Sequence, residues 1–438
     1  MKSVFLPVYL TLVLALVVSA CWDGGSWTYT PDPISLVSVD SDGVVGDDDS
    51  YFPALSSDGY YVAFYSFATN LVPSDANGQA DIFLHDTETG LTSRVSVSTA
   101  GTEANNYNGE PAVSGDGRYV VFTSSADNLV PSDTNLDSDV FMHDTVTAMT
   151  WRVSVSSAGT EGNAGSFSPD VSTDGRYVSF ISFATNMFAE AASYITDAFV
   201  RDTVSPLTTH VSVSSAGTPA NGVGVFDSAI SGNGNVVAFY GGSDNLVPGD
   251  NNDVHDMFIH DLGTAMTSRV SVSTMGTEAD AASGGQDVSA DGHYVVFASS
   301  ATNLVPDDTN GYQDVFLRDT QRGITSRVSV STMGTEGNYP SIEPGISADG
   351  RYVVFSSMAS NLVEGDNNSR TDIFLRDTRE RTTTLLTKSA EGDLSNGDSH
   401  GPAISADGRV VVFHSEATNL VANTIPADTV QIYRVGVP

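Results

Sequence analysis

Short runs of hydrophobic residues recur along this chain at a nearly fixed spacing. Each run follows a turn signal of the type Ser-x-Asp-Gly or Ser-x-Asn-Gly, as in the segment SADGRYVVF at 347–355. The serine of this signal returns seven times, with a step of 58 residues and a single step of 59, at Ser56, Ser114, Ser172, Ser231, Ser289, Ser347 and Ser405. A fixed period of this length indicates a repeat array or a closed ring.

Each repeat contains four short segments with the patterns of β-strands. Val95 and Val97 alternate with serines, which indicates a half-buried strand, whereas 119–122 and 140–142 are continuous apolar runs, typical of strands covered on both faces. Four such strands are the content of one propeller blade. The sequence therefore predicts an all-β protein, a seven-bladed β-propeller of four-stranded blades. From the axis outward we expect the segment before the turn signal, the run after it, the DVFLR-type segment, and the RVSVS-type segment outermost.

The repeats begin and end out of phase. Residues 36–39 match an outermost strand, but 431–435 match a third strand, so the last repeat lacks an outermost strand of its own. We expect 36–39 to complete the blade built from 402–435 and to close the ring. This pairing would cover both sheet edges that are otherwise exposed.

The first 33 residues differ in composition from the repeats. Residues 1–20 carry Lys2, an apolar run and small residues before Cys21, and they are interpreted as a secretory signal peptide. The segment 18–21 resembles a bacterial lipobox, which implies that Cys21 is lipidated. The alternative is an ordinary signal whose cleavage site adjoins a cysteine. Residues 21–33 are interpreted as a lipidated cysteine with a flexible tether, and 34–438 as the propeller.

The charge of the chain is strongly negative. Eighteen Lys and Arg residues stand against 54 Asp and Glu residues, a formal net charge of −36. Such a surface repels a phosphate backbone, so we expect no nucleic acid partner. Cys21 is the only cysteine, which leaves no disulfide framework, and stability must come from the ring.

Long polar loops are predicted to gather on one face of the ring. Because strand direction alternates, the loops from the second to the third strand share a face with those that enter the next blade. The other face receives the tight Asp-Gly turns and short connections. Since loops on a rigid scaffold commonly carry binding sites, the long-loop face is the expected working surface.

Five of the long loops contain the pattern DxNxxxD. Hard oxygen ligands close together on a tight turn suit calcium, so calcium is the candidate cofactor. The candidate metal-binding residues are Asp75, Asn77 and Asp81; Asp133, Asn135 and Asp139; Asp250, Asn252 and Asp256; Asp308, Asn310 and Asp314; and Asp366, Asn368 and Asp372. The alternative is that these residues only cap the loop through hydrogen bonds to backbone amides. The third and seventh blades depart from the pattern.

No catalytic residue is assigned from the sequence. The segment 397–401 matches GxSxG, but the nucleophile elbow needs a following helix, and here a strand is predicted. His85, His143 and His260 occupy a slot that other repeats fill with arginine, so they are interpreted as strand residues. The asparagine that opens each NLV-type segment, such as Asn128, is interpreted as a loop-fixing amide.

The SxDGRYVVF segment followed by D(I/V)FLxD resembles the TolB-like, WD-repeat-like propeller repeat, over about 34–438. This resemblance implies either interaction subunits of the bacterial envelope or glycan-active and peptidase propellers. The lyases of this type use several histidines as metal ligands, and no such cluster is evident in the sequence. We therefore expect a monomeric, exported lipoprotein anchored to the cell envelope, in the outer membrane or at the cell surface. It would bind a protein or glycan without catalysis and contact the membrane only through its lipid. The alternative is a polysaccharide lyase or hydrolase whose carboxylates converge at the central opening.

Overall fold

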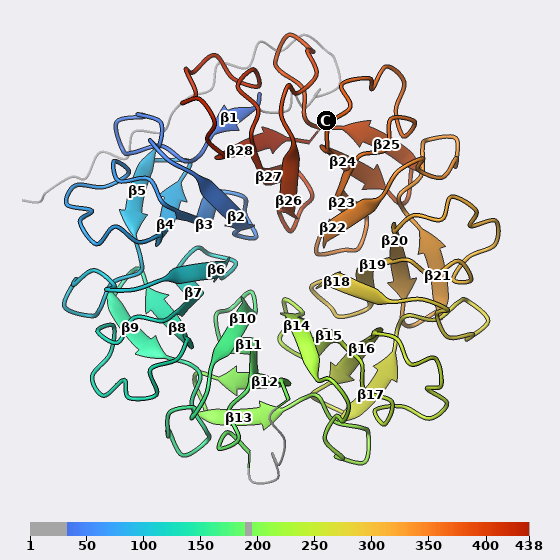
Figure 1. The fold of residues 1–438 in the computed structure, drawn as a ribbon, viewed down its shortest axis with the longest axis horizontal. Helices are drawn as coiled ribbons and strands as arrows, with labels where there is room; N and C mark the ends of the chain where they lie inside the picture. The colour runs from blue at the N-terminus through green and yellow to red at the C-terminus, as the bar shows by residue number, and fades with distance from the viewer. Residues whose placement is uncertain (1–32, 189–194, 438) are drawn as a thin grey trace, which may run out of the picture. The chain divides into compact units, whose positions relative to one another are not determined.

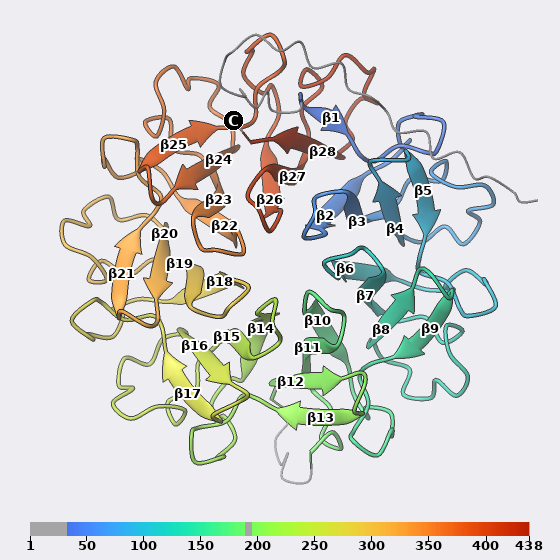
Figure 2. The same ribbon diagram turned by 180° about the vertical axis from the view of Figure 1, so that it is seen from behind.

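The computed structural model describes residues 33–188 and 195–437, which form seven four-stranded antiparallel sheets arranged around one axis. Figures 1 and 2 show the ring from its two faces, with one strand of each sheet beside the central opening. The prediction of a seven-bladed β-propeller is confirmed. Within the described residues, no helix is long and apolar enough to cross a membrane. The predicted signal peptide and Cys21 lie outside the described residues.

Each blade is named by its order along the chain, and its strands run outward from the axis. The first three blades are β2 (Ser50–Leu55), β3 (Tyr61–Ser66), β4 (Asp81–Asp86) and β5 (Leu91–Arg94); β6 (Asn108–Val113), β7 (Tyr119–Ser124), β8 (Asp139–Asp144) and β9 (Met149–Arg152); and β10 (Ser166–Val171), β11 (Tyr177–Ser182), β12 (Asp197–Asp202) and β13 (Leu207–His210). The next three are β14 (Val225–Ile230), β15 (Val236–Gly241), β16 (Asp256–Asp261) and β17 (Met266–Arg269); β18 (Ser283–Val288), β19 (Tyr294–Ser299), β20 (Asp314–Asp319) and β21 (Ile324–Arg327); and β22 (Ser341–Ile346), β23 (Tyr352–Ser357), β24 (Asp372–Asp377) and β25 (Thr382–Leu385). The seventh blade is β26 (Ser399–Ile404), β27 (Val410–Ser415), β28 (Gln431–Gly436) and β1 (Ser35–Leu36).

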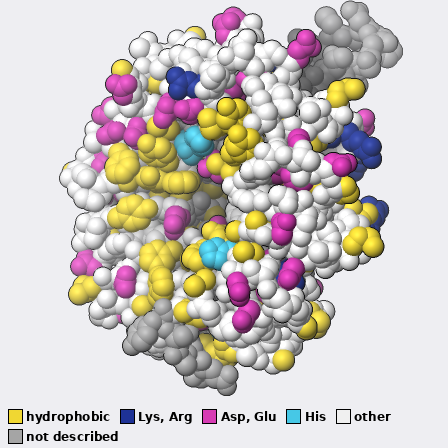
Figure 3. All heavy atoms as spheres, turned by 45° about the vertical axis from the view of Figure 1, so that its right-hand side comes forward, with side chains coloured by type: hydrophobic (Ala, Val, Ile, Leu, Met, Phe, Trp, Pro, Cys, Tyr) yellow, Lys and Arg dark blue, Asp and Glu magenta, His cyan; other side chains and the backbone are white. Residues whose placement is uncertain are grey.

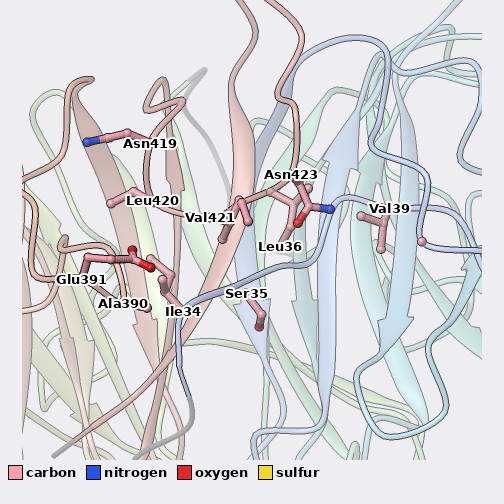
Figure 4. Close-up of a pocket in the computed structure, with 12 residues that line it drawn as sticks. Ile34, Ser35, Leu36, Val39, Ala390, Glu391, Asn419, Leu420, Val421 and Asn423 are labelled. Carbon is pink, nitrogen blue, oxygen red and sulfur yellow. The ribbon is translucent and has the colours of Figure 1, made fainter.

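The N-terminal strand closes the ring as predicted. Strand β1 pairs antiparallel with β28, with Leu36 opposite Tyr433, and the Val37 amide donates to the Ile432 carbonyl at 2.8 Å. A groove of about 610 Å³ lies beside β1, and Leu36, Val421 and Ala390 are among the residues that line it (Figure 4).

A second closure runs around the axis at the Asp-Gly turns. In six blades the backbone amide of the residue after the anchoring serine donates to a backbone carbonyl in the Asp-Gly turn of the next blade, at 2.9–3.1 Å. In the fourth blade the donor is the amide one residue later, that of Asn233. The last of these bonds joins Ala406 of the seventh blade to Ser57 of the first at 3.0 Å. The complete set links Ser57, Gly115, Thr173, Gly232 with Asn233, Ala290, Ala348 and Ala406. This ring of peptide groups borders a cavity of about 160 Å³ at the turn end of the central channel.

The outermost strands lie earlier in the chain than predicted. The strand β5 ends at Arg94, so the RVSVS segment contributes only its first residue. The reason is a side chain. The Ser96 hydroxyl accepts the Ile82 amide of β4 at 3.1 Å, where a backbone carbonyl of the outermost strand would accept it if the strand continued. The chain therefore leaves the sheet after Arg94 and turns toward the long-loop face.

The blades pack through one repeated aromatic pair and one repeated glycine. The second and third strands of each blade stack two buried rings, such as Phe122 and Phe141, whose centroids lie 6.0 Å apart. The glycine of the Asp-Gly turn lies against the preceding blade. A Cβ atom on Gly117, where φ is +73°, would lie 2.2 Å from the ring of Tyr61. The motif glycine therefore serves both the turn and the contact between blades.

Candidate functional site

An arginine occupies the centre of the predicted calcium loop in four blades. In the fifth blade Arg327 Nη1 lies 3.1 Å from Asp308 Oδ1, 2.9 Å from Asp314 Oδ2 and 2.9 Å from Glu336 Oε2. The same arrangement surrounds Arg94, Arg152 and Arg269. All four guanidinium groups come from the last residue of the outermost strand.

The carboxylates of these clusters are spaced so that a cation could lie between them, and an arginine guanidinium of the protein itself lies there. In the first blade, carboxylate oxygens of Asp75, Asp81 and Glu103 lie within 4.8 Å of one another, a spacing that a metal ion could bridge. Arg94 contacts all three. A metal ion could bind this cluster only by displacing the Arg94 guanidinium, and calcium binding stays a prediction. Burial raises the pKa of Asp75 to about 6, and the charge of Arg94 opposes that rise.

The asparagine of each DxNxxxD pattern performs the capping role of the alternative interpretation. Asn310 Nδ2 donates to Asp314 Oδ2 at 2.9 Å and to the Gly337 carbonyl at 3.0 Å, while its Oδ1 accepts the Tyr312 amide at 2.8 Å. The other four asparagines make the equivalent three bonds. These bonds join the two long loops that meet at each blade boundary.

The final aspartate of the pattern is a buried structural acceptor. Asp314 is fully buried, and its Oδ1 accepts the Ser329 hydroxyl at 2.6 Å. Every other blade has a matching bond, including Thr387 to Asp372 in the sixth and Ser38 to Gln431 in the closing blade. The side chain thus holds the outermost segment where it leaves the sheet.

Three blades lack the arginine cluster. In the sixth blade Leu385 and Leu394 replace the arginine and the glutamate, and burial raises the pKa of Asp372 to about 6. In the third blade His210 Nε2 lies 2.9 Å from Asp197 Oδ1, and residues 191 and 193 lie outside the described residues. Arginine and glutamate occur together or not at all, a signal in the sequence that would have revealed the ion pair.

A cavity of about 470 Å³ occupies the central channel at the ends of the innermost strands nearest the long loops. In Figure 3 hydrophobic side chains surround a hollow that also contains acidic and histidine side chains. The channel residues lie four positions before the anchoring serine, at a β-bulge that is present in every blade with small shifts in register. They are Phe52, Glu110, Ser168, Asp227, Gly285, Glu343 and Gly401.

Sequence reasoning missed these channel residues, although a signal was present. The repeat is regular at the turns and the buried strands, but at this position it changes in nearly every blade. Four of the non-glycine residues have positive φ, at 49° for Phe52 and Ser168, 52° for Glu110 and 54° for Glu343. The bulge imposes this uncommon conformation and re-aims the side chain.

Two channel glutamates bridge neighbouring blades. Glu110 Oε2 accepts the Thr123 hydroxyl and the Ser168 amide, both at 2.8 Å. Glu343 Oε2 accepts the Ser356 hydroxyl at 2.7 Å and the Gly401 amide at 2.9 Å, and lies 3.4 Å from His400 Nδ1. The pKa of Glu343 falls to about 2, because its hydrogen bonds and His400 outweigh the effect of burial. The side chain is still 40% exposed to the channel.

Three half-buried aspartates add to the negative charge of the channel. Asp170 and Asp287 lie two residues further along their strands, toward the Asp-Gly turns. Each accepts a backbone amide of the next blade, from Ile230 at 2.7 Å and from Ile346 at 2.9 Å. Burial raises the pKa of Asp170 and Asp227 to about 7 and that of Asp287 to about 6. Neighbouring carboxylates raise the pKa of Asp170 and Asp227 further.

Aromatic side chains form the mouth of the channel. Phe52 lines the cavity, is 54% exposed and stacks on Tyr65 with a centroid distance of 5.7 Å. His414 lies behind Phe52 at 5.8 Å, and burial lowers its pKa to about 4. Tyr107, which is 43% exposed, lines the same cavity.

The remaining sequence candidates have structural roles. Ser399 of the GxSxG match is buried in β26, where its hydroxyl bonds that of Ser415 at 2.8 Å, and a strand follows it in place of a helix. His85 Nδ1 lies 2.8 Å from the Thr92 hydroxyl, and His143 and His260 make the same contact. All seven NLV-type asparagines bond the backbone of the adjacent loop, as Asn128 does with the Glu103 carbonyl at 2.8 Å.

The fold is shared with several solved propellers. An oligogalacturonate lyase in complex with manganese is 11% identical, with 93% of this chain and 98% of that chain covered and a TM-score of 0.54. The propeller domain of the Trilobed protease from Pyrococcus furiosus is 12% identical, with 84% and 92% covered and a TM-score of 0.51. TolB from Acinetobacter baumannii is 16% identical, with 80% and 67% covered and a TM-score of 0.42.

The comparisons beyond structure give no match. No protein-family model matches the chain, and no curated protein matches it. At these identities the likeness to solved structures concerns the fold alone. The chain is a seven-bladed β-propeller with a channel that is acidic inside and aromatic at its mouth.

Proposed function

We propose that this protein is a lipid-anchored propeller of the bacterial cell envelope that binds a protein or glycan partner at the mouth of its central channel. It acts as a binding or scaffold module and works as a monomer. The observation that carries this proposal is the contrast between the two ends of the channel. A cavity of about 470 Å³ with exposed aromatic side chains lies at one end, and at the other a ring of backbone hydrogen bonds borders a smaller cavity of about 160 Å³.

The rigidity of the scaffold supports a binding role. Each channel residue is held by a bulge in an innermost strand, and Glu110 and Glu343 are fixed by hydrogen bonds to the next blade. A pre-formed site spends little free energy on ordering its side chains when a partner binds. Calcium enters this proposal as a candidate ligand of the acidic loops, where the carboxylate oxygens of the first and second blade clusters lie within 4.8 Å of one another.

The anchoring part of the proposal rests on the sequence around Cys21. A Cys21→Ala variant of the full chain should lose incorporation of labelled fatty acid and leave the membrane fraction, while its propeller melts at an unchanged temperature. Retention of the variant in the membrane fraction would contradict the lipid anchor.

The binding role is tested with variants of the aromatic mouth. Phe52→Ala and Tyr107→Ala in the full chain should weaken binding to envelope proteins or glycans at least tenfold. Met275→Ala is the matched control, because Met275 is 90% exposed on a loop away from the channel. Equal loss of binding in the control and the channel variants would remove the channel from the proposal.

A second candidate function is a glycan-active enzyme. It is favoured by two carboxylates whose pKa values move in opposite directions, about 7 for Asp227 and about 2 for Glu343. A protonated acid beside an ionised carboxylate is the pairing that glycoside cleavage uses. Turnover of neutral and acidic polysaccharides that is lost in both Asp227→Asn and Glu343→Gln would favour this enzyme over the binding module.

A further inference from the structure

The channel gathers negative charge with little compensating positive charge. Its cavity is lined by Glu110, Asp227 and Glu343, with Asp170 and Asp287 below them, and no lysine or arginine is among the described residues that line it. His400 Nδ1 lies 3.4 Å from Glu343 Oε2, and its hydrogen bond to this carboxylate raises the pKa of His400. Carboxylates held close together in a partly desolvated space repel one another, and a bound cation relieves that repulsion.

The arrangement of these carboxylates does not suit a chelated metal ion. Over the described part of the chain, the groups of three or more ligand atoms within 4.8 Å of one another belong to the first and second blade clusters, and none lies in the channel. A calcium ion needs six to eight oxygen ligands at about 2.3–2.6 Å. The channel carboxylates instead border a cavity of about 470 Å³, which is large enough for an organic group.

The mouth of the channel adds a surface that favours organic cations. Phe52 and Tyr107 line the cavity and expose ring surface there, and Phe52 is backed by the stacked ring of Tyr65. The faces of such rings attract ammonium and guanidinium groups, while their area packs against aliphatic chains. In addition, both amide atoms of Gln286 lack a hydrogen-bond partner, and this side chain lines the same cavity.

We infer that the central channel binds an organic cation, an ammonium or guanidinium group carried on an aliphatic chain, with its charge among the channel carboxylates and its chain against the aromatic mouth. This inference rests on the proposed function and narrows its ligand. The same chemistry occurs in a lysine or arginine side chain of a partner protein and in a free diamine. A polyanionic glycan has the wrong charge for this site.

The test is calorimetric binding to the full-length chain at pH 7.5. The probes are the peptide acetyl-Gly-Lys-Gly-amide, the same peptide with an acetylated lysine side chain, and the diamine cadaverine. The lysine peptide should bind at least tenfold more tightly than its acetylated form. The double variant Asp227→Asn with Glu343→Gln should reduce its affinity at least tenfold. Asp407→Asn is the matched control, because Asp407 lies in an Asp-Gly turn at the far end and its side chain is 54% exposed.

The relative affinities of the probes distinguish a protein segment from a free amine. Tighter binding of the peptide than of cadaverine assigns the cation to a protein segment, and the reverse order assigns it to a free amine. Equal affinity for the acetylated and unmodified peptides would overturn the inference, as would undiminished binding by a double variant that melts like the wild type. Should a neutral glycan bind at the aromatic mouth while no cation does, the inference fails and the proposed function stands.

Discussion

Arg327 lies 2.9 Å from Asp314, at the centre of a loop whose sequence predicts a calcium site. The arginine is nine-tenths buried and contacts three carboxylates. Because removal of one partner leaves buried charges uncompensated, Arg327→Ala should lower the free energy of unfolding by about 3–5 kcal/mol. Thermal melting checks this. Arg322→Ala, whose side chain is 73% exposed, should cost about 0–1 kcal/mol.

The same variant tests the relation between the guanidinium and calcium. Arg327→Ala leaves three carboxylates without their cation, so added calcium should raise its melting temperature more than that of the wild-type protein. Equal shifts in both proteins would mean that the guanidinium does not exclude the ion from this cluster.

The glycine of an Asp-Gly turn should be far less replaceable than a glycine in an open loop. Gly117 and Gly159 both have positive φ, at +73° and +79°, but a Cβ at Gly117 meets Tyr61 at 2.2 Å whereas a Cβ at Gly159 meets nothing within 4 Å. Gly159→Ala should cost about 1–2 kcal/mol from its backbone conformation alone. Gly117→Ala should cost about 1–3 kcal/mol more, since the tyrosine must move. Similar losses in the two variants, measured by denaturant unfolding, would contradict the contact between blades.

In the blade that closes the ring, a neutral hydrogen bond between serine and glutamine takes the place of the hydrogen bond from serine or threonine to aspartate that the other six blades contain. Ser38 donates to Gln431 at 2.7 Å, and both side chains are fully buried. Gln431→Ala leaves the buried Ser38 hydroxyl without an acceptor for its proton, although its oxygen still accepts the Ile432 amide, so it should cost about 1–3 kcal/mol. It should also speed proteolysis near residues 34–38. Asp42→Asn, in an exposed loop, should change neither stability nor cleavage.

The channel aspartates should give stability a distinctive pH dependence. The folded pKa is about 7 for Asp170 and about 6 for Asp287, above the ordinary value of 3.8 expected in the unfolded chain. As pH rises from 4 to 7 the unfolded chain loses these protons first, so stability falls across this window and is level above it. At about 1.4 kcal/mol per pKa unit, the change should be at most on the order of 3–4 kcal/mol for each aspartate, and smaller to the extent that water reaches the side chain.

The measurement is the melting temperature between pH 4 and pH 8 for the wild type and for Asp170→Asn with Asp287→Asn. The double variant should have a flatter profile in this window, whatever its absolute stability. An unchanged slope would show that other groups set the pH dependence.

The sequence by itself determined the blade, its sevenfold repetition and the closure of the ring. These features depend on local signals, namely the Asp-Gly turns, the apolar runs and the phase of the terminal segments, which repetition made unmistakable. The pattern of valines predicts the outermost strand at the RVSVS segment, but the strand ends at Arg94. The alternation continues past the strand because the Ser96 side chain there accepts the backbone amide of Ile82 in place of a backbone carbonyl.

Only the tertiary structure decided which charges meet. The sequence predicts Asp308 and Asp314 as metal ligands, but only the structure shows that Arg327 and Glu336 lie beside them. Likewise Glu110, Asp227 and Glu343 are far apart along the chain, and they share a cavity because the ring brings seven innermost strands to one axis. A strand pattern fixes which face of the sheet a side chain occupies, but its partners depend on tertiary structure: strand pairing within the fifth blade brings Arg327 to Asp314, and closure of the ring brings the channel carboxylates together.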